Sequence, residues 1–490
     1  MAFCVTARKK FRARTLSNVA RRALSTSDAV EINAYDRELF GLYSSGHEFF
    51  LTVTLADEQE FDLLVDTGSA QTYFPCEGCP QDACGVHEHA YYDWRMSKNF
   101  RVLNCTTSAS DGKYCRDEPE YFECYANKTS KLHGACVFGS LYADGSEAGG
   151  YLVQDVVGIL GSELTPIKMT FGCGGLRDAD GGSERHDGMA GFGRGAVTFH
   201  AQLAAAGAIN AHVFGFCSEG MDTSAAMLSL GRYDFGEELH ALEYTRMLGD
   251  TELAVQTKAW KIGNEKIAGS SNIYTVLDSG TTMTYIPTVM YKDFVGKLIA
   301  LVRGAGLNAY RVDVFGDDTW CFYANNARVS ASTLSRWFPN LSITYDPAVT
   351  LVLGPESYLF DHPTERSAMC LGIGEVNFPG VDAGQIILGQ LTLRDTYIEY
   401  DLEQLRVGMT VARCEKLRKK FATDSSPPQN VWRIVALVLA VVAAAQLVAL
   451  AIFACRAARS RRVGKWHALA PEDDREPALD GQIELSNVVR

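Results

Sequence analysis

Short apolar runs dominate the chain between about residue 45 and residue 415, and Gly, Asp and Asn separate them. Many runs alternate apolar and polar positions, which is typical of strands with one buried face. The stretch HEFFLTVTLADEQEFDLLVD, residues 47–66, predicts two strands joined by a polar turn. Helical periodicity is sparse, and VMYKDFVGKLIALVRGAG, residues 289–306, is its best example. The pattern predicts an all-β or β-dominated fold.

One predicted strand and the turn after it occur twice. FDLLVDTGSAQTYFP, residues 61–75, aligns without a gap with IYTVLDSGTTMTYIP, residues 273–287, at an offset of 212. Asp66 thereby matches Asp278, each at the end of an apolar run. The glycine and hydroxyl residues that follow also match, namely Gly68 with Gly280, Thr67 with Ser279, and Ser69 with Thr281. Such a repeat predicts two lobes related by a pseudo-twofold axis, with Asp66 and Asp278 facing each other.

A single Asp-Thr/Ser-Gly tripeptide would indicate no more than a turn at a strand end, where Asp and Gly are common. Here the tripeptide occurs twice, each time after a similar apolar run, and this favours a functional pair of aspartates over two plain turns. The glycine two residues after each aspartate lets the backbone approach closely and leaves room for a ligand. We expect Ser69 and Thr281 to bond the outer carboxylate oxygens, and Thr67 and Ser279 to tie the two turns together.

Two carboxylates brought together by such an axis cannot both ionise at low cost, so they share one proton and their apparent pKa values separate. Those values belong to the pair rather than to either residue. The charged member can take a proton from a bound water molecule, while the protonated member donates to the carbonyl oxygen under attack. The chemistry predicted for Asp66 and Asp278 is general acid–base hydrolysis without a covalent intermediate.

Composition and charge argue against several other classes. The chain has 490 residues, 47% of them hydrophobic, which is enough for more than one domain with a large core. Its formal net charge of −13 argues against a nucleic-acid partner, which needs a basic face. The sequence contains no Walker loop, no HExxH motif and no strand-linked GxGxxG motif, so we expect no cofactor and no metal.

Cysteines and glycosylation sequons indicate an oxidising compartment. Twelve of the fourteen cysteines are disulfide candidates: Cys76, Cys79, Cys84, Cys105, Cys115, Cys124, Cys136, Cys173, Cys217, Cys321, Cys370 and Cys414. Three Asn-x-Ser/Thr sequons occur in the same region, at Asn104, Asn127 and Asn340. The combination favours the lumen of the secretory pathway or the cell exterior over a reduced cytosolic protein with chance sequons.

A further segment predicts a membrane anchor and the lipid bilayer as a partner. Residues 434–455 carry no charge and one polar residue, Gln446, and a helix of this length spans a bilayer core of about 30 Å. Basic residues flank it on both sides, and those on the C-terminal side lie closer. With the sequons upstream, this predicts a single-pass type I protein whose large domain is lumenal or extracellular. The endoplasmic reticulum, later secretory compartments and the cell surface all fit.

The N-terminus fits this scheme less well. Residues 1–27 contain seven Lys or Arg, no acidic residue and no apolar core adequate for a signal peptide, a composition typical of a mitochondrial presequence. We give more weight to the cysteines and sequons, and interpret residues 1–45 as a basic extension or propeptide.

Over residues 45–415 the chain resembles the pepsin-like aspartic proteases. The resemblance rests on DTGS at 66–69, DSGTT at 278–282, LYADGSEAGGYLVQD at 141–155, DGMAGFG at 187–193 and IILGQLTLRDTYIEYDLEQLRVGM at 386–409. It implies two β-barrel lobes, a cleft between them and an extended peptide as substrate. The third motif is similar to the flap hairpin of this family. The substrate-binding residues that the resemblance implies are Tyr142 in the flap, Gly68, Ser69, Gly280, Thr281 and Thr282.

Within this family, FPCEGCPQDACGVHEHAYYD, residues 74–93, resembles the cysteine-rich insert of nepenthesin-type enzymes. With the membrane segment, the chain is most similar to the plasmepsin V-like subgroup, and its type I layout also resembles that of beta-secretase. In two departures from the family pattern, Tyr73 replaces the tryptophan that usually bonds the flap tyrosine, and Ala70 replaces a frequent serine. Neither removes the aspartate pair.

The resemblance also implies disulfide pairs. Cys321–Cys370 is similar to the second-lobe disulfide, and Cys217–Cys414 is similar to a bond that ties the lobe ends in secretase-like relatives. A third pair, Cys136–Cys173, is suggested without support from the resemblance. A zinc site is the alternative for one cysteine group, with Cys76, Cys79, Cys84 and His87 as ligands and His89 in reserve, although disulfides are commoner in a lumenal domain.

The predicted organisation is a basic extension at 1–45, an N-terminal lobe at 46–225 with a cysteine-rich insert at 76–136, a C-terminal lobe at 226–415, a linker at 416–433, a transmembrane helix at 434–455 and a cytosolic tail at 456–490. The predicted function is that of a monomeric, membrane-anchored aspartic endopeptidase acting on secretory-pathway proteins. The alternative is a catalytically inactive binding or inhibitor-like protein on the same fold, which usually lacks a motif residue.

Overall fold

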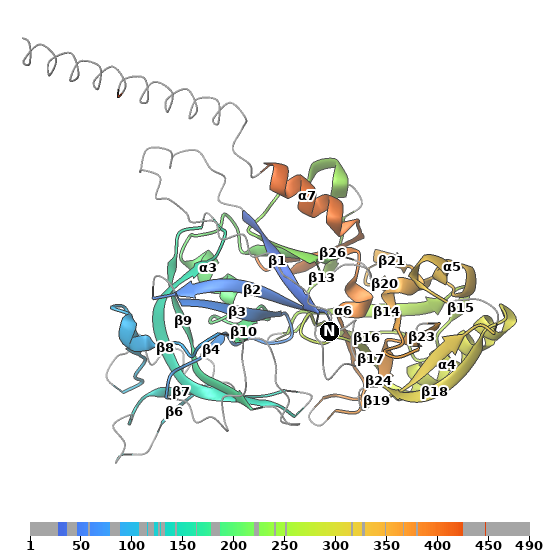
Figure 1. Cartoon of the computed structure of the whole chain (residues 1–490), viewed down its shortest axis with the longest axis horizontal. Coiled ribbons are helices and arrows are strands. Elements are labelled where there is room, and N and C mark those ends of the chain that lie inside the picture. Colours follow the sequence, from blue (N-terminus) through green and yellow to red (C-terminus); the bar gives the residue numbers. More distant parts are fainter. Residues whose placement is uncertain are drawn as a thin grey trace, which may run out of the picture. The chain divides into compact units, whose positions relative to one another are not determined.

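Strands are the predominant secondary structure of the described chain in the computed structural model, as the alternating pattern predicts (Figure 1). The structure describes residues 28–36, 47–56, 59–78, 89–106, 115, 122–125, 128, 133–142, 145–162, 164–177, 187–219, 225–239, 242–249, 252–314, 317–325, 329–347, 349–365, 367–378, 381–424 and 446.

The first repeat lies in a sheet of fifteen strands within the described residues. They are β1 (Asp28–Asp36), β2 (His47–Leu55), β3 (Gln59–Asp66), β4 (Tyr73–Pro75), β5 (Arg101–Val102), β6 (Phe122–Cys124), β7 (Cys136–Leu141), β8 (Glu147–Ile159), β9 (Ile167–Arg177), β10 (Gly188–Gly191), β11 (Val213–Ser218), β12 (Ala225–Leu230), β13 (Glu243–Arg246), β26 (Thr396–Asp401) and β27 (Arg406–Val411). β2 and β3 are the two strands predicted from residues 47–66, and they pair antiparallel. The side chains of Val53, Phe61 and Leu63 are buried in the core of this lobe.

The second repeat lies in a separate sheet of eight described strands. They are β14 (Ala254–Ile262), β15 (Glu265–Lys266), β16 (Ile273–Leu277), β17 (Thr284–Ile286), β20 (Leu341–Tyr345), β21 (Val349–Leu353), β24 (Ile373–Glu375) and β25 (Ile386–Leu388). A four-stranded sheet of β18 (Asn308–Val314), β19 (Asp317–Tyr323), β22 (Leu359–Asp361) and β23 (Ala368–Leu371) accompanies it.

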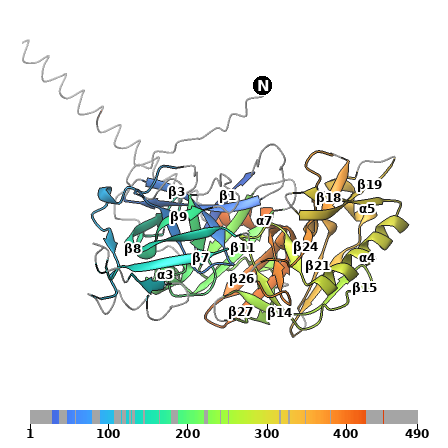
Figure 2. The ribbon, with the colours of Figure 1, turned by 90° about the horizontal axis from the view of Figure 1, so that it is seen from below.

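Within the described residues the helices are few and, apart from α4 and α7, short. They are α3 (Phe199–Ala205), α4 (Thr288–Gly304), α5 (Leu334–Trp337), α6 (Gln390–Leu393) and α7 (Cys414–Asp424), together with the 3-10 turns η1 (Trp94–Met96), η2 (Gly236–Leu239), η3 (Ala331–Thr333) and η4 (Pro355–Ser357). α4 confirms the helix predicted from residues 289–306, and it buries Met290, Phe294 and Leu298 at helical spacing. α4 and α5 lie on the side of the second lobe away from the first sheet (Figures 1 and 2).

The two repeats occupy equivalent places in their sheets. β3 pairs parallel with β10, with Asp66 beside Gly191, and β16 pairs parallel with β25, with Leu277 beside Leu388. The next strand of each repeat, β4 or β17, pairs antiparallel with that same partner and parallel with a third strand, β9 or β24. The internal repeat in the sequence is therefore also a repeat of topology, and it delivers one aspartate from each lobe.

The last two strands of the second lobe join the sheet of the first. β26 pairs with β11, and β27 pairs with β13. The chain thus connects its two lobes through a shared sheet. The predicted boundary between the lobes at residue 225 assigns β26 and β27 to the second lobe, although they pair in the sheet of the first.

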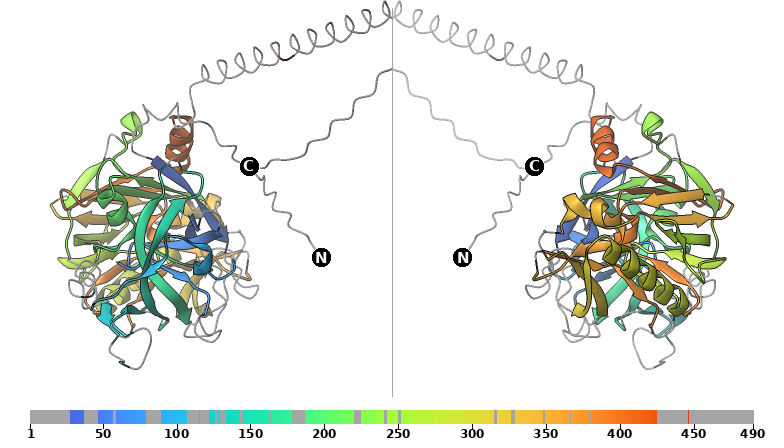
Figure 3. Two further views of the ribbon diagram at one scale, coloured as in Figure 1. Left: turned by 90° about the vertical axis from the view of Figure 1, so that its left-hand side faces the viewer. Right: turned by 90° about the vertical axis from the view of Figure 1, so that its right-hand side faces the viewer.

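Two expected boundaries differ from the structure. β1 lies within the predicted extension at 1–45, yet it pairs with both β12 and β2 in the first sheet. The predicted linker at 416–433 begins inside α7, whose side chains Cys414 and Leu417 are buried. Figure 3 shows α7, in orange, beside the green turn η2, and Lys420 donates to the carbonyl of Phe235 there. Both segments are part of the folded body, because backbone pairing and apolar burial hold them to it.

No helix among the described residues is long and apolar enough to cross a membrane. The predicted transmembrane segment at 434–455 lies outside the described residues except for Gln446, and so does the tail at 456–490.

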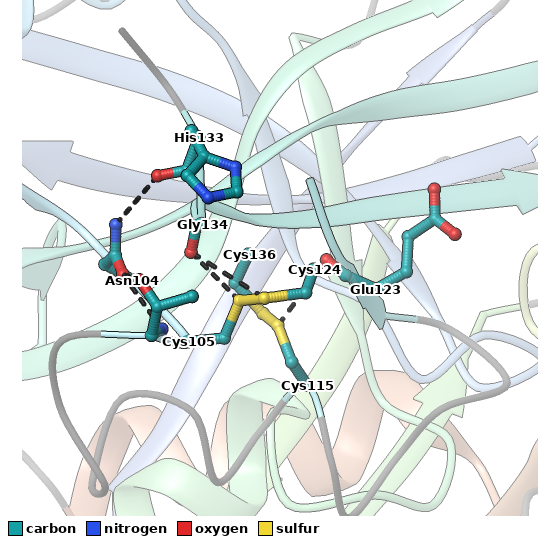
Figure 4. The surroundings of a disulfide bond; sticks show 9 residues. Asn104, Cys105, Cys115, Glu123, Cys124, His133, Gly134 and Cys136 are labelled. Atoms are coloured by element: carbon teal, nitrogen blue, oxygen red, sulfur yellow. Dashed lines mark hydrogen bonds between the residues drawn. A yellow bond between two sulfur atoms is a disulfide. The ribbon is translucent and has the colours of Figure 1, made fainter. Parts of the chain in front are cut away.

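Five disulfides join described cysteines, namely Cys76–Cys173, Cys105–Cys124, Cys115–Cys136, Cys217–Cys414 and Cys321–Cys370. The last two are the pairs that the resemblance implied. The suggested pair Cys136–Cys173 is wrong. β4 and β9 run parallel with Phe74 beside Cys173, which brings Cys76 to that cysteine. Cys136 lies on β7 opposite Cys124 and bonds Cys115 (Figure 4).

Candidate active site

Asp66 and Asp278 approach each other at the ends of two buried strands. Each accepts a hydrogen bond from the amide two residues later, Gly68 or Gly280, at 2.8 Å in both loops. A Cβ atom on Gly68 would lie 2.7 Å from the Asp278 carboxyl carbon, and one on Gly280 would lie 2.5 Å from Asp66 Oδ1. The glycines therefore let each loop pass directly over the other lobe's carboxylate, which explains their presence in both repeats.

Thr67 and Ser279 tie the two loops together through four buried hydrogen bonds. The Thr67 amide donates to Ser279 Oγ at 3.0 Å, and the Ser279 amide donates to Thr67 Oγ1 at 2.8 Å. Each hydroxyl then donates across the axis to a strand carbonyl, Thr67 to Leu277 at 2.8 Å and Ser279 to Val65 at 2.7 Å. This is the cross-tie expected from the sequence, and it fixes the separation of the two carboxylates.

The outer hydroxyls differ between the loops. Thr281 Oγ1 donates to Asp278 Oδ2 at 2.6 Å, as expected. The Ser69 hydroxyl is buried beside Asp66 but makes no well-directed hydrogen bond to a described residue, so that part of the expectation does not hold in the same form. Ser69 still lowers the pKa of Asp66 by its proximity.

The two carboxylates occupy unequal environments. Asp66 is 6% exposed, whereas Asp278 is half-buried. Burial raises the pKa of Asp66 well above its ordinary value, the negative charge of Asp278 raises it further, and Ser69 and the Gly68 amide oppose the rise. The pair therefore retains one proton at pH values where an isolated carboxyl would be charged.

Each aspartate loop is supported from behind by a glycine-containing segment of its own lobe. In the first lobe the amides of Phe192 and Gly193 donate to the carbonyls of Asp66 and Ser69, at 2.7 and 2.8 Å. In the second, the Asp278 amide donates to the Leu388 carbonyl at 3.0 Å, and the side chain of Gln390 donates to the Ser279 carbonyl at 2.8 Å. Sequence reasoning missed Gln390, because its role depends on a contact between segments about 110 residues apart.

The predicted flap is the hairpin of β7 and β8. The Tyr142 amide donates to the Ser146 carbonyl at 2.8 Å, and Tyr142 packs beside the cluster that contains Tyr73. Tyr73, which replaces the usual tryptophan, stacks on Phe138 of β7 with ring centroids 6.0 Å apart. Ser140 donates to the side chain of Gln71, a link that the sequence did not reveal. The segment after Asp66 is thus joined to the flap by a ring stack and a hydrogen bond.

The described residues do not assemble the zinc site considered for the cysteine-rich insert. Cys76 is disulfide-bonded, and His89 instead bonds Asp187 through its ring and its amide, at 2.7 and 2.8 Å. Cys79, Cys84 and His87 lie outside the described residues. Elsewhere, Cys321, His362 and Cys370 lie close together, but both cysteines are in a disulfide and offer no thiolate.

The sequons have different surroundings. Asn340 is exposed at the start of β20. Asn104 is half-buried beside Gly134 and is engaged through both side-chain atoms, accepting from the amide and hydroxyl of Thr106 and donating to the His133 carbonyl (Figure 4). Asn127 lies outside the described residues.

Comparisons with known proteins agree with this geometry. The sequence model of the family described as eukaryotic aspartyl protease matches residues 48–412. An aspartic proteinase of Oryza sativa subsp. japonica is 26% identical over 79% of this chain and 93% of its own length. Aspartic proteinase nepenthesin-2 of Nepenthes gracilis is 25% identical over 76% of this chain and 79% of its own. A secreted aspartic protease of Candida albicans is 23% identical over 72% of this chain and 78% of its own.

Proposed function

Because this chain belongs to the eukaryotic aspartyl protease family and is an aspartic endopeptidase, we propose that Asp66 and Asp278 are its catalytic pair. The observation that carries the proposal is the crossed approach of the two loops, in which each glycine lies against the opposite carboxylate. Both aspartates, both glycines and the Thr67–Ser279 cross-tie are present, which argues against an inactive binding protein on this fold.

In this mechanism Asp66 donates a proton and Asp278 accepts one. Asp66 is buried with a raised pKa, whereas Asp278 receives hydrogen bonds from Thr281 and Gly280 that stabilise negative charge. Asp278 takes a proton from a water molecule while the oxygen of that water attacks the peptide carbonyl carbon. Asp66 protonates the carbonyl oxygen in the same step. The tetrahedral diol then collapses: Asp278 returns its proton to the leaving nitrogen, and Asp66 recovers one from the diol.

We propose that the substrate is an extended peptide held between the flap and the two loops. Tyr142 contacts it from the flap, as the resemblance implies. Gly68, Ser69, Gly280, Thr281 and Thr282 contact it from the loops; Gly280 is exposed, and Thr281 and Thr282 are half-buried, so a ligand can reach them.

We also propose a membrane-anchored enzyme of the secretory pathway or cell surface. The uncharged segment 434–455 supports the anchor, and the five disulfides support an oxidising compartment. The cysteine-rich insert supports a place in the nepenthesin and plasmepsin V-like subgroup. Glycosylation is proposed for the sequons at Asn104, Asn127 and Asn340, and the exposure of Asn340 supports modification there.

The test is peptide cleavage by the full-length chain made in an oxidising secretory host. A mixed peptide library is assayed from pH 4 to 7.5 beside Asp66→Asn and Asp278→Asn, which retain the shape of the side chains. We expect each variant to lower kcat by at least about 10³-fold, because each removes a proton-transfer group from the pair. Circular dichroism of the variants controls for folding. Full activity in either folded variant would contradict the assignment, and no cleavage by the folded wild type would favour the binding protein.

A further inference from the structure

A pair of histidines lies behind the Asp66 loop, and the mechanism above does not use it. His200 is on α3 and is 1% exposed, and His212 lies just before β11. Nδ1 of His200 and Nε2 of His212 are 2.9 Å apart. Nε2 of His200 lies 2.9 Å from the carbonyl oxygen of Gly193. One imidazole therefore joins the second histidine to the segment that supports the Asp66 loop.

The hydrogen-bond partners limit the protonation states that the pair can adopt. A carbonyl oxygen can only accept, so Nε2 of His200 carries a hydrogen and donates it to Gly193. In the neutral ring Nδ1 of His200 is then an acceptor, and His212 donates to it from Nε2. The observed arrangement is one in which at least one ring is neutral. It cannot accommodate two positive charges, because both facing nitrogens would then be donors.

The path from this pair to Asp66 is short and consists of backbone hydrogen bonds. The Gly193 amide donates to the carbonyl of Ser69 at 2.8 Å, and the Phe192 amide donates to the carbonyl of Asp66 at 2.7 Å. A Cβ atom on Gly193 would lie 2.8 Å from the Ser69 carbonyl oxygen, so the two segments are in direct contact. Movement of Gly193 would therefore move the loop that presents Asp66.

The surroundings of His200 are apolar and offer no compensating charge. Its ring packs on Phe214 and Phe192, with centroids 4.7 and 5.6 Å apart. Burial and, to a smaller extent, the neighbouring His212 together lower the pKa of His200 to about 3, against an opposing effect of the hydrogen bond to Gly193. Burial also lowers the pKa of His212, against an opposing effect of Glu403.

The titratable groups on the adjoining elements are few among the described residues. α3 contributes only His200, the neighbouring β9 contributes the exposed Lys168, and the loop that carries Gly193 contributes the half-buried Arg194. Tyr400 of β26 stacks on Phe214. The turn between β26 and β27 contributes Glu403, which accepts from the His212 amide at 3.1 Å and lies 3.8 Å from Arg232. Asp401 is bonded to Arg232 and Arg406. Of these groups, only His212 faces His200 directly.

We propose that His200 and His212 are positioning residues for the aspartate pair, which hold Gly193 in place while at least one ring is neutral and release it when both are protonated. The inference rests on the proposed catalytic role of Asp66. A protonated pair favours any state in which α3 moves and the rings reach water, and such a state lacks the bond to Gly193. The enzyme is then expected to lose activity on the acidic side by displacement of the Asp66 loop, before the aspartates become doubly protonated.

The test compares two substitutions of His200 in the full-length enzyme. Gln at this position can still donate to Gly193 but cannot take up a proton, whereas Phe fills the space without a donor. We expect wild-type activity to fall about tenfold within one pH unit below about pH 4, and His200→Gln to move this limb about one unit lower with kcat near wild type at pH 7. We expect His200→Phe to lower kcat about tenfold or more at every pH, with KM changed less than about threefold.

The control is His133→Gln, the same substitution at an exposed histidine, which should leave the profile unchanged. Hydrogen exchange of peptides covering residues 66–72 and 190–196 gives a readout that does not need activity. After correction for intrinsic rates, exchange should accelerate about tenfold in the wild type between pH 5 and pH 3 and not in His200→Gln. If Asp278→Asn keeps its activity, the assignment of Asp66 and Asp278 as the catalytic pair is wrong. The hydrogen-exchange data still test whether the histidine pair holds the Asp66 loop in place.

Three results would overturn the inference. The first is an acidic limb at the same pH in His200→Gln and the wild type. The second is a His200→Phe enzyme with wild-type kcat. The third is an exchange rate at residues 66–72 that does not respond to pH or to either substitution. If His200→Phe does not fold, His200→Gln decides the question alone.

Discussion

The two aspartate loops share a scaffold but differ in what lies behind them. In both, a buried strand ends at the aspartate, the next glycine crosses the opposite carboxylate, and a partner strand supports the turn. Behind the first loop the support continues to His200, a group that can take up a proton. Behind the second it ends at the side-chain amide of Gln390, which cannot.

The two carboxylates also differ in burial and in hydrogen bonding. Asp66 is buried and its pKa is raised, whereas Asp278 is half-buried and receives a hydroxyl from Thr281. A pseudo-symmetric scaffold thus supplies the geometry of the pair, and local departures from the symmetry give its two members unequal surroundings. Substitutions made at equivalent positions of the two loops separate the effect of the shared scaffold from the effect of the local differences.

Substitution of the crossing glycines should have the largest effect. In Gly280→Ala or Gly68→Ala the new Cβ would lie 2.5 to 2.7 Å from the opposite carboxylate, so the loops must separate. We expect each variant to lower kcat/KM by about 10²-fold or more, since small displacements of catalytic groups cost this much. Gly296→Ala is the matched control, because nothing lies within 4 Å of a Cβ in that position of α4. Activity near wild type in either loop variant would show that the crossing is looser than the structure indicates.

The cross-tie should contribute symmetrically. Thr67→Val and Ser279→Ala each remove one hydroxyl that accepts from an amide and donates to a carbonyl across the axis. We expect each to lower the free energy of unfolding by about 2–3 kcal/mol, because buried partners are left unsatisfied. Urea unfolding of both variants and of the double variant forms a cycle in which the two effects should be less than additive. A difference between the single variants larger than about 1 kcal/mol would contradict the reciprocal arrangement.

The outer hydroxyls should differ in their effect on the pH profile. Ser69 lowers the pKa of Asp66, so Ser69→Ala should raise that pKa and move the basic limb of kcat/KM to higher pH. Thr281→Val should instead reduce kcat at all pH values, because it removes the 2.6 Å hydrogen bond to Asp278. Identical profiles for the two variants would remove the asymmetry between the loops.

A titratable group outside both loops should change stability and leave activity unaffected. Burial raises the pKa of Asp395 from 3.8 to about 6, with further contributions from the charges of Glu356 and Glu219. The folded state therefore binds its proton more tightly than the unfolded state, and stability declines as the pH rises from about 4 to about 6. Asn also tolerates the φ of 48° at this position, so Asp395→Asn should raise the free energy of unfolding by about 1 kcal/mol at pH 7. Below about pH 4 the two proteins should be equally stable, and a difference there would contradict the assignment.

The sequence predicted the parts of the site that the repeat encodes. Asp66, Asp278, both glycines and the Thr67–Ser279 cross-tie follow from one gapless alignment, because residues that meet across a pseudo-twofold axis occupy equivalent positions in the two copies. The strands and α4 follow from apolar periodicity, since each buries one face.

What the sequence did not predict depends on contacts between distant segments. Cys76 pairs with Cys173 because β4 and β9 are parallel neighbours, and no spacing rule predicts that register. β1 was interpreted as part of an extension, since its strand character matters only once β12 and β2 are beside it. His200 and His212 belong to no motif in the sequence, and their role emerges only when α3 lies behind Gly193.

The most direct test of the central claim is the pH dependence of kcat/KM for one peptide, measured from pH 2 to pH 9 with the full-length enzyme. A pair that shares one proton predicts a bell-shaped profile whose basic limb lies well above the pKa of an ordinary carboxyl, and whose activity is absent at every pH in Asp66→Asn. A profile with a single limb near the ordinary carboxyl pKa, or a bell retained by Asp66→Asn, would contradict the shared proton and the assignment of this pair.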